Sequence, residues 1–88
     1  MRRNEEYVAD EFEDKVVLFN PEDETLITLN SSAMYMWKNC DGDEDTIADN
    51  FLTIIDTSEM SEADLQTVRS ECKAVIQNMK EKRVLLDE

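Results

Sequence analysis

Carboxylates are the most abundant reactive groups in this 88-residue chain, with 22 Asp and Glu against nine Lys and Arg, and no histidine. The absence of histidine removes the commonest general base and the base of Ser-His and Cys-His nucleophile pairs. Neighbouring carboxylates are frequent, but an acid-rich surface produces such pairs by chance. We therefore expect no catalytic residues and predict that the chain is not an enzyme.

One group of carboxylates has the spacing that opens a calcium-binding loop: Asp41, Asp43 and Asp45. Counted from Asp41, an EF-hand loop needs glycine in sixth place and glutamate in twelfth. This chain has Thr46 and Leu52 there. The pattern favours a turn and a helix cap, and we expect neither a metal site nor a cofactor. A calcium-responsive module is kept as a weaker alternative.

The two cysteines, Cys40 and Cys72, are far apart and lack metal-ligand spacing. Both fall on apolar faces of expected helices, which favours core packing over reactivity. No apolar stretch resembles a signal peptide or reaches the ~20 residues of a membrane span. We expect free thiols and a cytoplasmic protein.

The formal net charge of −13 opposes binding to nucleic acids and anionic membranes and favours neutral or basic partners. The charge is unevenly distributed: residues 1–14 hold six acids against two arginines, whereas five of the nine bases lie between Arg69 and Arg83. Strands combined with three helices can also form a winged helix that binds DNA. Its recognition helix would here begin with Ser-Glu-Ala-Asp at 61–64, which would place carboxylates against the DNA phosphates. DNA binding is therefore disfavoured.

Two runs rich in β-branched and apolar residues, Lys15–Phe19 and Thr25–Leu29, flank the turn cluster Asn20–Glu24. This arrangement predicts an antiparallel hairpin with Ile27 and Leu29 facing the core. A weaker strand is expected near residues 7–12.

Three helices should follow. The first is capped by Asn30 and ended by Asp41-Gly42, and its apolar face comprises Ala33, Met36, Trp37 and Cys40. The second has the stripe Ile47, Phe51, Ile54 and Ile55. The third opens on a capping box at residues 61–64 and carries Leu65, Val68, Cys72, Val75, Ile76 and Met79. An extended tail, residues 84–86, closes the chain. The order predicts a single α+β domain over residues 1–88, with helices on one face of a short antiparallel sheet.

The strand at Thr25–Leu29 is expected at an edge of this sheet, because no later run is strong enough to pair with it. Natural edges are usually protected by charge, proline or a bulge, and this strand contains none of them. An unprotected edge beside a helix favours the addition of a strand from a partner.

The segments Val16–Glu22 and Ile27–Ala33, followed by Trp37 and Cys40–Gly42, resemble PqqD-like proteins in order and spacing. The likeness covers about residues 12–88. Two departures fall in loops: the turn Asn20–Glu24 is about a residue longer than usual, and an extra acidic residue follows Gly42. They leave the subfamily open.

The resemblance implies a RiPP recognition element, a domain that binds the leader of a ribosomally synthesised precursor peptide. It also implies a winged-helix-like fold of three strands and three helices, with the leader added to the third strand and lying against the third helix. Carried over by position, the strand contacts are Thr25, Leu26, Ile27, Thr28 and Leu29. The helix contacts are Leu65, Val68, Arg69, Cys72 and Ile76.

Among these helix contacts, Leu65 and Val68 fit a purely core role equally well. Arg69 is a lone cation beside the expected groove between the third strand and the third helix, and it is the expected polar specificity contact. The partners implied are the precursor peptide and a separate modifying enzyme, for which the radical-SAM class is one candidate. The alternative function is that of an acidic adaptor or anti-regulator that docks on a basic protein surface.

Overall fold

The computed structural model describes residues 1–87 and consists of five strands and three helices. The strands are β1 (Arg2–Arg3), β2 (Val8–Glu11), β3 (Lys15–Asn20), β4 (Thr25–Asn30) and β5 (Leu85–Leu86). The helices are α1 (Ser31–Lys38), α2 (Glu44–Ile54) and α3 (Glu62–Glu81). The α+β class and the three-stranded antiparallel sheet followed by three helices are confirmed. Among the described residues, no helix is both long and apolar enough to cross a membrane.

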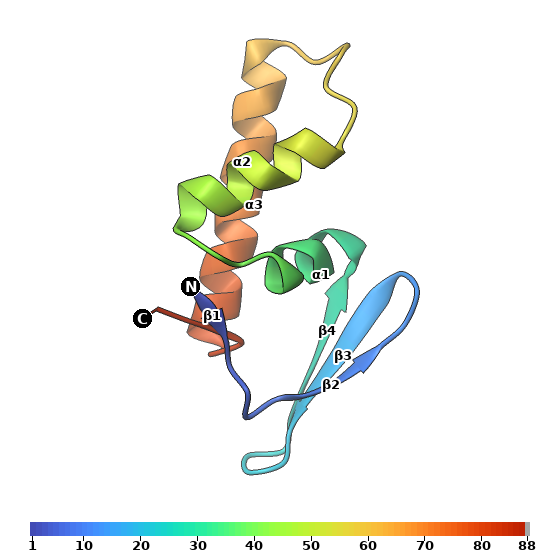
Figure 1. The fold of residues 1–88 in the computed structure, drawn as a ribbon, viewed down its shortest axis with the longest axis vertical. Helices are drawn as coiled ribbons and strands as arrows, with labels where there is room; N and C mark the ends of the chain where they lie inside the picture. Colours follow the sequence, from blue (N-terminus) through green and yellow to red (C-terminus); the bar gives the residue numbers. More distant parts are fainter. Residues whose placement is uncertain (88) are drawn as a thin grey trace.

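The main sheet has the strand order β2-β3-β4, and both neighbouring pairs are antiparallel. The predicted hairpin is present as β3 and β4, and the weaker predicted strand is β2. Side chains alternate between the two faces, so Val16, Leu18, Ile27 and Leu29 are buried against the helices. In Figure 1, α1 covers the sheet, whereas α2 and the first half of α3 extend beyond it.

The extended segment predicted at residues 84–86 is present as β5 at Leu85–Leu86, and the structure adds a pairing partner that the sequence did not predict. Leu85 and Leu86 pair antiparallel with Arg3 and Arg2 in a two-stranded ladder. The Asn4 side chain also donates a hydrogen bond to the Arg83 carbonyl oxygen. The two chain ends therefore lie together beside the last turns of α3 (Figure 1).

Each helix begins at a side-chain cap. Asn30, Asp43 and Ser61 accept hydrogen bonds from backbone amides three residues later, and Ser61 forms the predicted reciprocal box with Asp64. The expected stop at Asp41-Gly42 is wrong, because α1 already ends at Lys38 with Asn39 as its cap. Gly42 does adopt a left-handed φ of 96°, but in the loop before α2.

The core lies between the inner face of the sheet and the three helices. Its largest fully buried side chains are Leu18, Met36, Ile47, Ile76, Met79, Leu85, Val16 and Val84. Ile54 departs from its predicted place on the apolar stripe of α2. It is the last residue of that helix and is 53% exposed.

Replacing Ser61 by alanine is expected to lower the free energy of unfolding by about 1 kcal/mol, because the capping box of α3 loses its hydroxyl acceptor. Urea denaturation measures the change. Ser70→Ala is the matched control, since Ser70 is exposed within α3 and alanine favours helix there. Equal stability of the Ser61 variant and the control would contradict the assigned cap.

Candidate functional site

The outer edge of β4 is open, because β4 pairs with β3 and with no other strand among the described residues. Its hydrogen-bonding pattern follows from the turn between β2 and β3, where the Phe12 amide donates to the Lys15 carbonyl oxygen. This bond directs the main-chain groups of Lys15 toward β2. Because the direction alternates along an antiparallel strand, the main-chain groups of Val16, Leu18 and Asn20 face β4.

The register then identifies which residues of β4 are free to pair with another strand. The partners of those three β3 residues are Leu29, Ile27 and Thr25. The intervening residues, Leu26 and Thr28, therefore direct their N–H and C=O groups away from the sheet. Both have exposed side chains, and no charge, proline or bulge protects this edge within residues 25–30.

A groove of about 230 Å³ lies beyond the C-terminal end of β4, where that strand, α1, α2 and α3 meet. Its lining residues are Asn30, Ser32, Met36, Phe51, Val68, Glu71, Cys72 and Val75. Helix α3 provides four of them at the spacing i, i+3, i+4 and i+7, so they share one face of the helix. The lining is mostly apolar and includes one carboxylate. It suits an apolar side chain with a neutral or basic neighbour.

The ten residues predicted to contact a peptide fall into three groups. Val68 and Cys72 line the groove, and Leu26 and Thr28 form the open edge. Thr25, Leu65 and Arg69 are half-buried outside the groove lining. The remaining three, Ile27, Leu29 and Ile76, are buried in the core. The structure thus brings a subset of the predicted residues to one region and assigns others to packing.

Arg69 is not an isolated cation beside the groove, as the sequence suggested. It forms an ion pair with Asp49 of α2, and one turn later Lys73 pairs with Asp45. Lys80 lies 3.7 Å from Glu44 and continues this row of contacts between α2 and α3. Three cations of α3 therefore face carboxylates of α2 along the contact between the two helices. A contact between Arg69 and a peptide stays a prediction.

Sequence reasoning missed six groove residues: Asn30, Ser32, Met36, Phe51, Glu71 and Val75. Met36, Phe51 and Val75 were assigned to apolar stripes, and an apolar stripe does not show which of its residues also line a groove. Glu71 could have been found from its spacing, because it follows Val68 by three residues and precedes Val75 by four. The positions of the other two, Asn30 and Ser32, in the groove wall depend on where α1 begins.

Cys72 contributes a thiol to the groove but is 3% exposed, and burial raises its pKa above the ordinary value. We expect this thiol, in a Cys40→Ala background, to react with a maleimide more than about tenfold slower than free cysteine at pH 7, since thiolate and access are both reduced. Reaction should accelerate as the pH rises toward the raised pKa. Stopped-flow labelling measures the rate, and a reactivity equal to free cysteine would contradict the packing.

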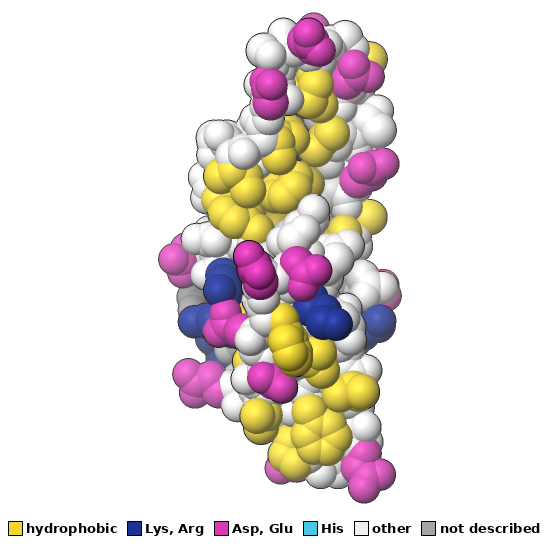
Figure 2. All heavy atoms as spheres, turned by 90° about the vertical axis from the view of Figure 1, so that its right-hand side faces the viewer, with side chains coloured by type: hydrophobic (Ala, Val, Ile, Leu, Met, Phe, Trp, Pro, Cys, Tyr) yellow, Lys and Arg dark blue, Asp and Glu magenta, His cyan; other side chains and the backbone are white. Residues whose placement is uncertain are grey.

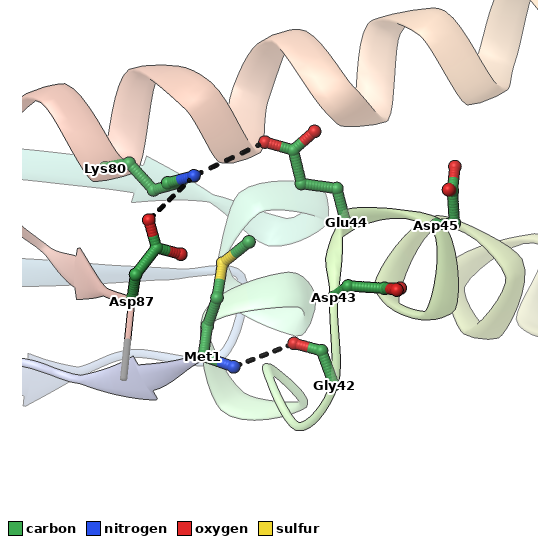
Figure 3. Close-up of a pocket in the computed structure, with 7 residues that line it drawn as sticks. All are labelled: Met1, Gly42, Asp43, Glu44, Asp45, Lys80 and Asp87. Atoms are coloured by element: carbon green, nitrogen blue, oxygen red, sulfur yellow. Dashed lines mark hydrogen bonds and ion pairs between the residues drawn. The ribbon is translucent and has the colours of Figure 1, made fainter.

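A larger hollow of about 670 Å³ lies on another side, lined by Met1, Gly42, Asp43, Glu44, Asp45, Lys80 and Asp87. Lys80 lies between two carboxylates (Figure 3). Its Nζ is 3.1 Å from Asp87 Oδ2 and 3.7 Å from Glu44 Oε1. The hydrogen bond that the Lys80 ammonium donates to the Asp87 carboxylate is the main cause of the raised pKa of Lys80. Asp43 is occupied as the cap of α2. The charged groups here serve the fold.

The carboxylates at 41, 43 and 45 lie in the loop before α2 and in its first turn. Over residues 1–87, no group of three or more His, Cys, Asp or Glu side chains is arranged to hold a metal ion. The Asp43 carboxylate accepts a hydrogen bond from the Thr46 amide, which lowers the pKa of Asp43. Asp45 pairs with Lys73. The turn-and-cap interpretation of this segment is the one that the geometry supports.

Comparison with known proteins gives two findings. The family model of coenzyme PQQ synthesis protein D (PqqD) matches residues 15–85. The fold is similar to a solved structure of TbiB1 in complex with the TbiA(beta) leader peptide. The TM-score is 0.73 at 18% identity, and the alignment covers 100% of this chain and 98% of the other. No curated protein matches. The likeness to TbiB1 shows the fold, and the family match covers most of the chain.

Proposed function

The chain belongs to the PqqD family, and we propose that it is a RiPP recognition element, which binds the leader of a ribosomally synthesised precursor peptide by strand addition to β4. The observation that carries the proposal is the open edge at Leu26 and Thr28 next to the mostly apolar groove. The fold shared with TbiB1, which was solved with a leader peptide, supports it. We place this binding domain in the cytoplasm.

Main-chain hydrogen bonds provide affinity in this mechanism. An added strand pairs with the outward N–H and C=O groups of Leu26 and Thr28, which are the same for any leader sequence. Alternate side chains of the added strand then face the helices, because the side-chain period of a strand is two. One apolar side chain enters the groove between Phe51, Val68 and Cys72. This pocket selects among leaders that would otherwise bind equally.

Charge refines the choice of leader. The domain carries a formal net charge of −13, and Glu71 adds to the groove wall a carboxylate that forms no ion pair within residues 1–87. A leader with an apolar residue followed or preceded by Lys or Arg is therefore favoured over an acidic one. Among the predicted contacts on α3, Ile76 is buried in the core and would act on the leader only through packing, whereas direct contacts of Leu65 and Arg69 with the leader stay a prediction.

The domain acts by positioning, not by making or breaking bonds. A leader held on β4 keeps the attached core peptide near any enzyme that also binds the domain, which raises its effective concentration. The modifying enzyme is a separate polypeptide, with the radical-SAM class as a candidate. Removal of this domain is then expected to raise the enzyme's KM for the precursor.

Titration of the ¹⁵N-labelled domain with its cognate leader is expected to shift the amides of residues 25–30 and 64–76. Binding of the leader should involve both the main chain of β4 and the groove face of α3, and heteronuclear correlation spectra report each separately. A saturating cognate leader that shifts neither segment would contradict the proposal.

The acidic adaptor is the second candidate, favoured by the six carboxylates within residues 1–14. The salt dependence of the binding affinity distinguishes the adaptor from the leader-binding domain. Raising ionic strength from about 0.05 M to 0.5 M shortens the Debye length more than twofold and should collapse the affinity of an adaptor for a basic surface. Leader binding by strand addition into an apolar groove should lose little.

A further inference from the structure

A row of apolar side chains crosses the outer face of the main sheet, on the side away from the helices. Val8, Phe19 and Leu26 are directly opposite one another on β2, β3 and β4. Their exposed fractions are 60%, 39% and 66%. An antiparallel sheet with one covered face normally presents polar residues on the other. Figure 2 shows hydrophobic side chains gathered over the lower, sheet part of the molecule with acidic side chains beside them.

Carboxylates surround this row. Asp10 lies on the same face of β2, Glu13 and Asp14 form the turn to β3, and Glu22, Asp23 and Glu24 form the turn to β4. Glu11 is not part of this rim, because it faces the helices and pairs with Lys38 of α1. Over residues 8–30, Lys15 is the only base. It lies 5.3 Å from the ring of Phe12, itself 49% exposed. The surface thus has an apolar centre and an acidic rim.

We propose that this sheet face, defined by Val8, Phe19 and Leu26, docks on the modifying enzyme through an apolar patch rimmed by Lys and Arg. The inference rests on the proposed function and identifies the surface used for presentation. Charge complementarity selects this occupant: a basic rim is attracted by the carboxylates, whereas a second copy of a chain with charge −13 is repelled.

The row is also continuous with the leader site. Leu26 ends the row at the open edge of β4, and its main chain is free to pair with the leader. A leader strand added there would extend the sheet and place one of its own side chains next in the row. The enzyme that docks on this face therefore contacts the domain and the bound leader together. Docking through such a shared surface would favour the leader-bound domain over the free one.

The test replaces Phe19 by threonine, which retains a β-branched strand residue on the central strand, away from the β4 edge. An enzyme identified by its action on the same precursor is titrated against the leader-bound domain in calorimetry. We expect the Kd of the enzyme for the domain to rise about tenfold or more, as for the loss of an aromatic anchor. The leader's own Kd should change less than about threefold, since β4 is intact. Charge reversal by Glu13→Lys with Glu22→Lys should also weaken docking and reduce its salt dependence.

Ile54→Thr is the matched control, because Ile54 is 53% exposed at the end of α2, away from the sheet. It should leave the enzyme's Kd unchanged. Equal enzyme affinity of wild type and Phe19→Thr would overturn the docking surface while leaving leader binding intact. Failure of the wild-type domain to bind the leader would instead refute the proposed function. Sedimentation tests whether the wild-type domain self-associates. If it does, and if Phe19→Thr makes it monomeric, the partner of this face is a second copy of the chain, and the proposal that the enzyme docks there is overturned.

Discussion

Replacing Thr28 by proline is expected to weaken leader binding about a hundredfold while the domain stays folded. The Thr28 N–H points away from β3, so no hydrogen bond of the β3–β4 ladder is lost. Proline removes a donor that an added strand needs, and its ring blocks close approach along the edge. The hydrogen bonds at residue 28 lie in the middle of a short added strand. Their loss should weaken leader binding about a hundredfold, or roughly 2.7 kcal/mol.

Thr28→Val is the control for this change, because it keeps both the amide and the β-branched shape. It should bind the leader within about threefold of wild type. Isothermal calorimetry measures both affinities, and circular dichroism checks that the proline variant is folded. A folded Thr28→Pro domain with wild-type affinity would show that the leader does not pair with this edge.

Ile76→Ala is expected to lower the free energy of unfolding by about 2–5 kcal/mol, the largest stability effect that we predict for a single change. Ile76 is fully buried, so its truncation leaves a cavity in the core between α3 and its neighbours. A domain of this size has a small stability margin, and such a loss can unfold it. Ile76→Val, expected to cost about 0.5–1.5 kcal/mol, keeps the measurement possible.

Val68→Ala is the matched comparison on the same helix. Val68 is half-buried and lines the groove. Its truncation should therefore lower the free energy of unfolding less than Ile76→Ala does, but it should also lower the affinity for the leader. Urea denaturation and leader titration of all three variants separate the roles. If Val68→Ala were the more destabilising change, with leader affinity intact, the division between groove and core would be wrong.

The local features were predictable because short-range chemistry determines them. The β3–β4 hairpin follows from two β-branched runs around a turn cluster, and the caps at Asn30 and Ser61 follow from side-chain acceptors before apolar periodicity. The open edge was predictable for a related reason: no later segment had the length or composition to pair with it.

Features that depend on distant residues were not predictable. The pairing of Arg2 and Arg3 with Leu85 and Leu86 joins short segments at the two ends of the chain, and neither has a strand pattern of its own. The Arg69–Asp49 ion pair depends on how α2 lies along α3. Similarly, an apolar stripe cannot distinguish Ile76 in the core from Val68 in the groove, since both positions repeat with the same period.

Residue-resolved hydrogen exchange of the β4 amides tests the central claim most directly. In the free domain, the amides of Leu26 and Thr28 should exchange quickly, whereas those of Ile27 and Leu29 are protected by β3. Saturation with the cognate leader should slow exchange at Leu26 and Thr28 by about tenfold or more, because each gains a strand partner. Unchanged exchange at both amides, with the leader bound, would contradict completion of the β4 edge by the leader.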